Sequence, residues 1–191
     1  MLPWAAEIYQ RNRRGVTEPN EKGLDQYDPN YNCYPPGPTR NIGRPFPFEI
    51  RQFTDVVFLL FEPGHWIRRF YVDGRGHPEG FPVTWMGHSI GKYQDGRLVV
   101  DTISIHDESW IDGLGHPHSE ALHLVEGWRR LNHETLEYEV TFDDPETYTK
   151  PWGGKLLFQL QQPPFDQMLE DVICEHLLEM GKSWPGDVNR R

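Results

Sequence analysis

The sequence has no apolar run long enough to cross a membrane as a helix, and its longest candidate, VVFLLF at 56–61, has the length of a strand. Basic residues are few, since 19 Lys and Arg stand against 29 Asp and Glu, for a formal net charge of −10. Nucleic acids and anionic membrane surfaces require a basic footprint, so this composition argues against both as main partners. The opening segment, MLPWAAEIYQRNRR, lacks the apolar core of a secretory signal peptide.

Motifs for the common cofactors and nucleophiles are also missing. There is no G-x-G-x-x-G fingerprint and no P-loop, so no nucleotide cofactor is expected. Neither an H-E-x-x-H helix motif nor paired Cys-x-x-Cys motifs point to a metal. Ser89 and Ser119 do not stand in the G-x-S-x-G elbow of serine hydrolases. Any chemistry must therefore come from other residues.

Only two cysteines occur, Cys33 and Cys174, and they are far apart in the chain. Their number suits one disulfide in an oxidising compartment. Two buried thiols fit the composition equally well.

Strand signals dominate from residue 49 onward. The 18 Gly and 17 Pro predict frequent turns and argue against long helices. The segment TLEYEVTF, at 135–142, alternates apolar and polar residues as a half-buried strand does, and Asp95-Gly96 is a hairpin dipeptide. Seven or eight strands with short connections predict an all-β fold closed as a single antiparallel, lipocalin-like barrel, because closure removes exposed edges. A β-sandwich is the alternative.

The residues before the barrel predict a different organisation. PWAAEIYQRNRR, at 3–14, favours a short helix, and Pro3 suits its first turn. Residues 15–48 predict a long irregular arm that wraps the surface or covers a site. We therefore expect one structural domain, with the helix and arm at 1–48 and the barrel at 49–191. The tail QMLEDVICEHLLEM, at 167–180, fits either a helix or a strand followed by a helical turn.

Six motifs follow one another along nearly the whole chain: PWAAEIYQRN, DPNYNCYPPGPTR, YVDGRGHP, WMGHSIG, GHPHSEALHLVE and DDPETYTKPW. In these motifs and their order the chain resembles a family of uncharacterised bacterial proteins that are commonly exported. The resemblance implies a periplasmic or secreted mature protein and favours a disulfide between Cys33 and Cys174. It implies no activity. One departure is the pair Gly127-Trp128, where the family often has Arg-Phe, and it places an indole beside Glu126.

The segment DGLGHPHSEALHLVEGW, at 112–128, holds three histidines between two acidic residues. A histidine held by a carboxylate titrates near neutrality and can move a proton. Asp112 with His118, or Glu126 with His123, would supply such a pair at the mouth of the barrel. We predict that His118 is the general base and that Asp112 orients it.

Further residues are expected to hold the substrate. Arg68 would stabilise developing negative charge, and Arg75 could hold a carboxylate or an oxyanion. The remaining predicted substrate-binding residues are Tyr71, Trp85, His88 and Trp128. The predicted function is a cofactor-free lyase or isomerase step, such as elimination, retro-aldol cleavage or isomerisation. Its substrate would be a small ring-bearing or aromatic organic molecule held in the barrel.

Other interpretations of the same residues stay open. The barrel could belong to an exported small-molecule binding protein, although polar strand residues are costly to bury without purpose and favour an enzyme. These polar strand residues are Gln52, Glu62, Arg68, His88, Asp101, His123 and Glu126. A divalent transition metal could instead be held by His116, His118 and His123. The histidine segment could also be a turn whose side chains only cap backbone groups. The oligomeric state is left open, a homodimer included.

Overall fold

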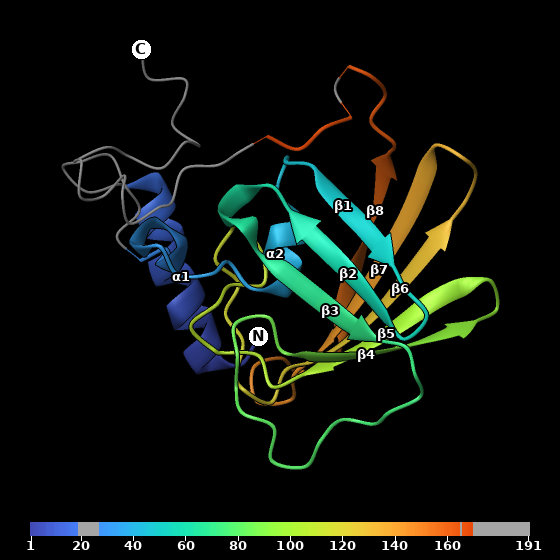
Figure 1. The fold of residues 1–191 in the computed structure, drawn as a ribbon. Coiled ribbons are helices and arrows are strands. Elements are labelled where there is room, and N and C mark those ends of the chain that lie inside the picture. The colour runs from blue at the N-terminus through green and yellow to red at the C-terminus, as the bar shows by residue number, and fades with distance from the viewer. Residues whose placement is uncertain (19–26, 165, 170–191) are drawn as a thin grey trace.

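The computed structural model describes residues 1–18, 27–164 and 166–169, and one curled sheet dominates it (Figure 1). The helical elements are α1 (Pro3–Thr17), η1 (Pro29–Asn32), α2 (Pro38–Ile42) and η2 (Pro63–His65). The strands are β1 (Phe48–Gln52), β2 (Val56–Phe61), β3 (Ile67–Tyr71), β4 (His88–Gln94), β5 (Arg97–Ile103), β6 (His123–Arg130), β7 (Thr135–Asp143) and β8 (Trp152–Gln159). None of the described helices is both long and apolar enough to span a membrane.

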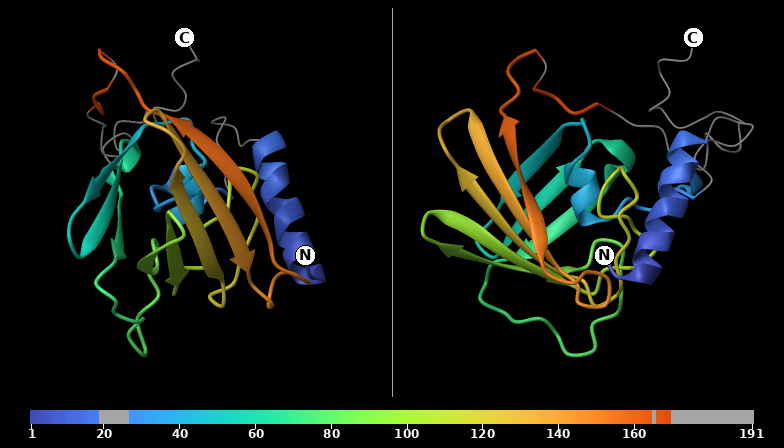
Figure 2. Two further views of the ribbon diagram at one scale, coloured as in Figure 1. Left: turned by 90° about the vertical axis from the view of Figure 1, so that its right-hand side faces the viewer. Right: turned by 180° about the vertical axis from the view of Figure 1, so that it is seen from behind.

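Each strand pairs with the next one along the chain, so the sheet runs in order from β1 to β8. The sheet curls into a half-barrel with α1 outside it, which confirms the prediction of an all-β, barrel-like fold with a short N-terminal helix (Figure 2). Among the described residues, β1 and β8 form no ladder with each other, so the sheet stays open at that seam. Side chains bridge the seam instead, because the rings of Phe48 and Phe158 meet edge to face with centroids 4.9 Å apart.

One strand pair departs from the antiparallel prediction. β3 and β4 run parallel, with Phe70 opposite Ser89 and Tyr71 opposite Ile90. A parallel connection must carry the chain back to the end where the first strand began, and a tight turn cannot do this. The crossover 72–87 makes that return as a wide loop, drawn in green below the sheet in Figure 1.

The inner face of the half-barrel is packed with large side chains. On β7 the predicted alternation is confirmed, since Tyr138, Val140 and Phe142 are buried in the core. Trp128 on β6 contacts Phe48 and Tyr138, at centroid distances of 6.2 and 4.5 Å. Burying an apolar or aromatic side chain of this size contributes about 1.5–3 kcal/mol. The interior around Trp128 is therefore filled by rings, where a ligand cavity had been predicted.

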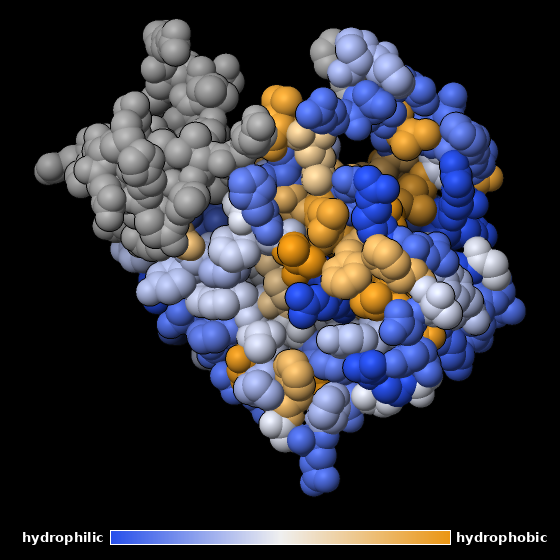
Figure 3. Space-filling view, in the orientation of Figure 1, coloured by the Kyte–Doolittle hydropathy of each residue, from blue (hydrophilic) through white to orange (hydrophobic). Residues whose placement is uncertain are grey.

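The outer face of β2 and β3 carries hydrophobic side chains as well, gathered near the centre of the view in Figure 3. β2 has apolar residues on both faces, and Ile67 on β3 is 48% exposed. Between β4 and β5, Asp95 and Gly96 take φ values of 51° and 73°, the conformation of the predicted two-residue hairpin turn.

Helix α1 is tied to loops at one end of the sheet. The Asn12 side chain donates to the carbonyl of Gly115 at 2.9 Å, and the indole of Trp4 donates to the carbonyl of Glu146 at 2.9 Å. Most of the ambiguous tail, from residue 170 on, lies outside the described residues. Cys174 belongs to it, so the disulfide with Cys33 stays a prediction.

Candidate functional site

Four ionisable side chains on the outer face of the sheet are joined end to end by hydrogen bonds. Oδ1 of Asp101 lies 2.9 Å from Nε2 of His77, and Oδ2 lies 2.8 Å from Nε2 of His123. Nδ1 of His77 in turn lies 2.8 Å from Nδ1 of His88. We call Asp101, His77, His88 and His123 the Asp101–histidine cluster. The side chains of Asp101 and His123 are 40% and 39% exposed, so this end of the cluster is open to solvent, whereas His88 at the other end is 5% exposed.

The strand register explains how three of these residues meet. Val100 and Thr102 are buried in the core, so Asp101 between them points outward. Asp101 pairs with Val125 on β6, which makes His123 its diagonal neighbour on the same face. His88 lies opposite Ile103 on β5 and shares that face. Thus β4, β5 and β6 each place one member of the cluster.

The fourth member, His77, comes from the crossover 72–87. The parallel β3–β4 connection carries this segment past the outer face of β4 and β5, where His77 reaches both His88 and Asp101. A tight antiparallel turn between β3 and β4 would have contained no residue at this position.

One arrangement of protons satisfies all three contacts with neutral histidines and an ionised Asp101. His77 and His123 each donate an Nε2–H to the carboxylate. The Nδ1 of His77 then holds a lone pair and accepts from the Nδ1–H of His88. This leaves a lone pair on Nε2 of His88, a nitrogen for which the described residues provide no hydrogen-bond partner.

The surroundings of His88 keep the ring uncharged. Burial lowers the pKa of His88 below its ordinary value, and the nearby His77 and Arg75 lower it further. A neutral imidazole at neutral pH is the form that accepts a proton.

Aromatic rings and one cation surround the same imidazole. Tyr71 stacks on His88 with centroids 5.5 Å apart, and Phe81 lies 4.6 Å away on a tilted plane. Arg75 places its guanidinium 4.1 Å from the centre of the Tyr71 ring and binds Asp73 at 2.5 Å. The structure thus gathers four of the predicted site residues here, namely Tyr71, Arg75, His88 and His123.

Arg68 and Glu126 lie elsewhere, inside the half-barrel. They form two hydrogen bonds of 2.9 and 2.7 Å, and Tyr138 donates its hydroxyl to Glu126 at 2.9 Å. Both charged side chains are 0% exposed. The predicted placement of Arg68 against a substrate and the pairing of Glu126 with His123 are therefore wrong. The reason is strand parity, since Glu126 points into the core and His123 points outward.

The predicted position of Trp128 against a ligand is also wrong, because the indole is buried among the rings of the core. Trp85 lies apart from both the buried core and the Asp101–histidine cluster. It stacks on His106 with centroids 4.5 Å apart and on Tyr34 at 5.2 Å, and it has no ring contact with the Asp101–histidine cluster among the described residues.

The predicted pairing of Asp112 with His118 is wrong as well. Asp112 lies 2.7 Å from Nδ1 of His116 instead. Burial disfavours the charged form of Asp112, but the interactions with the His116 ring and with the backbone N–H groups of Leu114 and His116 together outweigh it and lower the pKa of the carboxyl. Gly115, with φ of 87°, and Pro117 make this segment a turn, so the two histidines are held by different partners.

The partners of His118 occupy both of its nitrogens. Nδ1 donates to the carbonyl of Ser119 at 2.9 Å, which leaves Nε2 to accept from the Ser109 hydroxyl at 2.9 Å. The ring is 3% exposed, and burial lowers its pKa. With no nitrogen left for a substrate, His118 is poorly placed to act as the general base. Its bonds join the loop after β5 to the turn before β6.

The three histidines of the alternative metal site do not converge. His116 binds Asp112, His118 binds Ser109 and Ser119, and His123 binds Asp101. Within residues 1–18, 27–164 and 166–169, no group of three or more His, Cys, Asp or Glu side chains is arranged to hold a metal ion.

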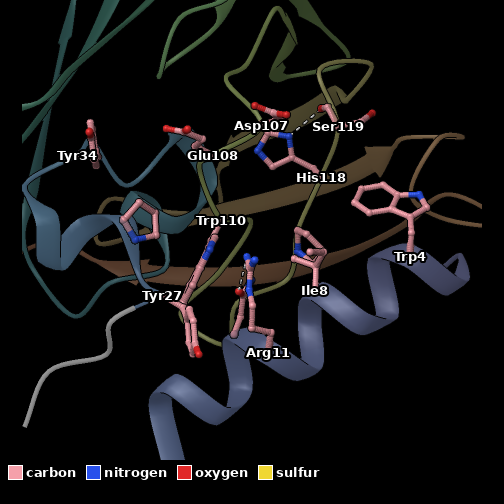
Figure 4. Close-up of a pocket in the computed structure, with 13 residues that line it drawn as sticks. Trp4, Ile8, Arg11, Tyr27, Tyr34, Asp107, Glu108, Trp110, His118 and Ser119 are labelled. Carbon is pink, nitrogen blue, oxygen red and sulfur yellow. Dashed lines mark hydrogen bonds between the residues drawn. The ribbon is translucent and has the colours of Figure 1, made fainter. Parts of the chain in front are cut away.

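A cleft of about 470 Å³ lies between α1 and the loops beside it (Figure 4). Trp4, Ile8 and Arg11 face it from the helix, and Asp107 and Glu108 lie on the opposite side. His118 and Trp110 contribute to the wall between them. This cleft shares no residue with the Asp101–histidine cluster.

Comparisons of the chain with protein-family models, curated proteins and solved structures find no match. The resemblance of its motifs to an exported bacterial family therefore stays a prediction, and function is argued from the geometry.

Proposed function

We propose that the protein is a cofactor-free acid–base enzyme, of the lyase or isomerase type, in which the Asp101–histidine cluster moves a proton. The substrate would be a small ring-bearing organic molecule. The observation that carries this proposal is the chain of hydrogen bonds from Asp101 through His77 to His88, which ends at an Nε2 that has no hydrogen-bond partner among the described residues.

In the proposed step, Nε2 of His88 accepts a proton from the substrate. The positive charge need not stay on that buried ring, because the Nδ1 proton of His88 can pass to Nδ1 of His77, 2.8 Å away. The resulting cation lies beside the Asp101 carboxylate, at 2.9 Å, which stabilises it. The carboxylate thus orients the relay and offsets the charge that the base acquires, as in other carboxylate–histidine pairs.

The rings around His88 fit a ring-bearing substrate. Tyr71 and Phe81 offer apolar faces beside the base, and Arg75 lies against Tyr71. The positive charge of Arg75 would stabilise an enolate or alkoxide formed when the proton leaves. Proton abstraction beside a carbonyl, followed by elimination or by return of the proton at another carbon, uses only these groups.

The proposal can be tested without knowing the natural substrate. Small ring-bearing carbon acids are incubated with the protein in D₂O, and NMR or mass spectrometry measures deuterium incorporation at carbon. Removal of a general base typically lowers a rate by about a hundred- to ten-thousandfold. We therefore expect exchange by the wild type and its loss in His88→Gln.

Asp101→Asn should lower the same rate, because the amide carries no charge to stabilise the His77 cation. The exposed His133→Gln serves as the matched control and should exchange at the wild-type rate. Equal rates in wild type and His88→Gln, or no exchange above the buffer rate across the set of carbon acids, would contradict the proposal.

A second candidate function, a small-molecule binding protein, is favoured by the aromatic cleft beside α1.

A further inference from the structure

The cleft beside α1 concentrates exposed aromatic rings. Trp4, Tyr27 and Tyr34 all line it, and they are 44%, 38% and 48% exposed. They come from three separate segments, namely α1, the residues before η1 and the residues after η1. Exposed rings that gather around one hollow are typical of a binding surface. The volume of about 470 Å³ suits a small organic molecule.

The charges around the cleft are unevenly distributed. Asp107 and Glu108 are adjacent on the side opposite α1 (Figure 4). Asp107 has only a 3.5 Å contact with His106, and the Glu108 carboxylate has no ionic partner among the described residues. Arg11, on the helix side, lies over the Tyr27 ring at 5.5 Å. The side opposite the helix therefore presents two carboxylates that a ligand can pair with.

Apart from Arg11, the residues that line the cleft add no positive charge. His118 lines the cleft, and burial keeps its ring neutral by lowering its pKa. Aromatic faces attract cations through their ring electrons, so Trp4 and Tyr34 reinforce the preference set by the carboxylates. The formal net charge of −10 favours the approach of a cation to the whole molecule.

From these observations we infer that the cleft is a binding site for a small aromatic amine, with its ring among Trp4, Tyr27 and Tyr34 and its ammonium group beside Asp107 and Glu108. The site is separate from the Asp101–histidine cluster and does not depend on the proposed enzyme activity.

Three probes that share one ring but differ in charge test the inference. Indole-3-ethylamine is a cation at neutral pH, tryptophan is a zwitterion and indole-3-acetate is an anion. Calorimetric or fluorescence titrations of the whole protein should show the amine binding most tightly and the acid most weakly. No measurable binding of the amine at millimolar concentration would overturn the inference, as would binding of the acid as tight as that of the amine.

Variants locate the site. The double variant Asp107→Asn/Glu108→Gln should weaken binding of the amine by roughly three- to tenfold. The difference in affinity between the amine and the acid should become smaller. The matched control Glu134→Gln/Asp143→Asn removes the same formal charge from exposed positions outside the cleft and should leave binding unchanged. If both double variants weakened amine binding equally, the effect would come from the overall charge of the protein, and the placement of the ammonium group beside Asp107 and Glu108 would be overturned.

The aromatic part of the site has its own pair of variants. Tyr34→Ala should weaken the binding of all three probes by roughly tenfold, because each probe loses the same ring contact. Tyr93, on β4, is 55% exposed outside the cleft, so Tyr93→Ala is the control and should bind all three as the wild type does. Wild-type affinity in Tyr34→Ala would overturn the placement of the ring.

Discussion

The guanidinium of Arg68 and the carboxylate of Glu126 meet inside the half-barrel through two hydrogen bonds of 2.9 and 2.7 Å, one for each carboxylate oxygen. Both groups are completely buried. Burial disfavours the charged form of Arg68, but Glu126 outweighs it and raises the pKa of the guanidinium. Tyr138 adds a third hydrogen bond to the carboxylate. Each charge is therefore tolerated in the core only because the other is present.

We expect Arg68→Met to lower the free energy of unfolding by about 3–5 kcal/mol, because it leaves the Glu126 carboxylate buried without its counter-charge. Urea denaturation monitored by tryptophan fluorescence measures the change. The double variant Arg68→Met/Glu126→Leu removes both charges and should recover at least about 1 kcal/mol of that loss. A double variant no more stable than Arg68→Met would show that the two charges are not coupled.

A second prediction concerns the titration of His88. Its imidazole should titrate below the ordinary histidine value of 6.5, mainly because of burial and further because of His77 and Arg75. Arg75→Gln removes one nearby positive charge and should move the pKa of His88 upward. Histidine NMR signals followed against pH measure this shift. Arg51→Gln, on the exposed side of β1, is the control and should leave the pKa of His88 unchanged. If this control shifted the pKa of His88 as much as Arg75→Gln does, Arg75 would not be the specific cause.

The two buried histidines also predict how stability depends on pH. Burial, the largest cause in each case, lowers the pKa values of His88 and His118 below 6.5 in the folded state. The unfolded chain therefore takes up protons first, and stability should fall as the pH drops below 6.5. Each histidine that is protonated in the unfolded chain and neutral in the folded protein changes the free energy of unfolding by up to about 1.4 kcal/mol per pH unit.

Urea midpoints at pH 7.5 and 5.5 check this expectation. His118→Gln removes one of the two groups, so its loss of stability between these pH values should be smaller than that of the wild type. A wild type equally stable at both pH values would be inconsistent with the folded-state environment of the two rings.

Two neighbouring glycines on β8 provide a matched pair. A Cβ at Gly153 would overlap the carbonyl oxygen of Val140 on β7, whereas a Cβ at Gly154 meets nothing within 4 Å. We expect Gly153→Ala to cost about 1–3 kcal/mol of stability and Gly154→Ala to stay within about 0.5 kcal/mol of the wild type. Thermal and urea unfolding of both variants measure the difference, and equal effects would show that the β7–β8 pairing differs from that described.

Periodicity predicted the parts of this molecule that depend on neighbouring residues. The alternation along β7 and the Asp95-Gly96 turn are local properties of the chain, and the structure contains both. The parallel β3–β4 pair was missed because direction depends on where a long segment carries the chain, which residue types do not reveal. His77 was missed for the same reason, since its partners Asp101 and His88 lie on strands that follow the crossover.

Part of the candidate site could have been found from the sequence. Asp101 and His123 are both outward positions on strands that are consecutive in the sheet, and strand parity alone places them on one face. The choice of partner for Asp112 could not be found in this way. It depends on the turn at Gly115 and Pro117, where backbone angles and not residue spacing decide which histidine the carboxylate meets.

The short parallel pairing of β3 with β4, called here the β3–β4 joint, also affects how the chain folds. The two strands pair over only two positions there, whereas every antiparallel pair of the sheet is paired over at least five positions. The β3–β4 pairing therefore has the fewest backbone hydrogen bonds to hold it, and it forms only when the crossover 72–87 has closed a long loop. The protein should therefore behave as two folding units, and amide hydrogen exchange should open the joint before it opens β5, β6 and β7.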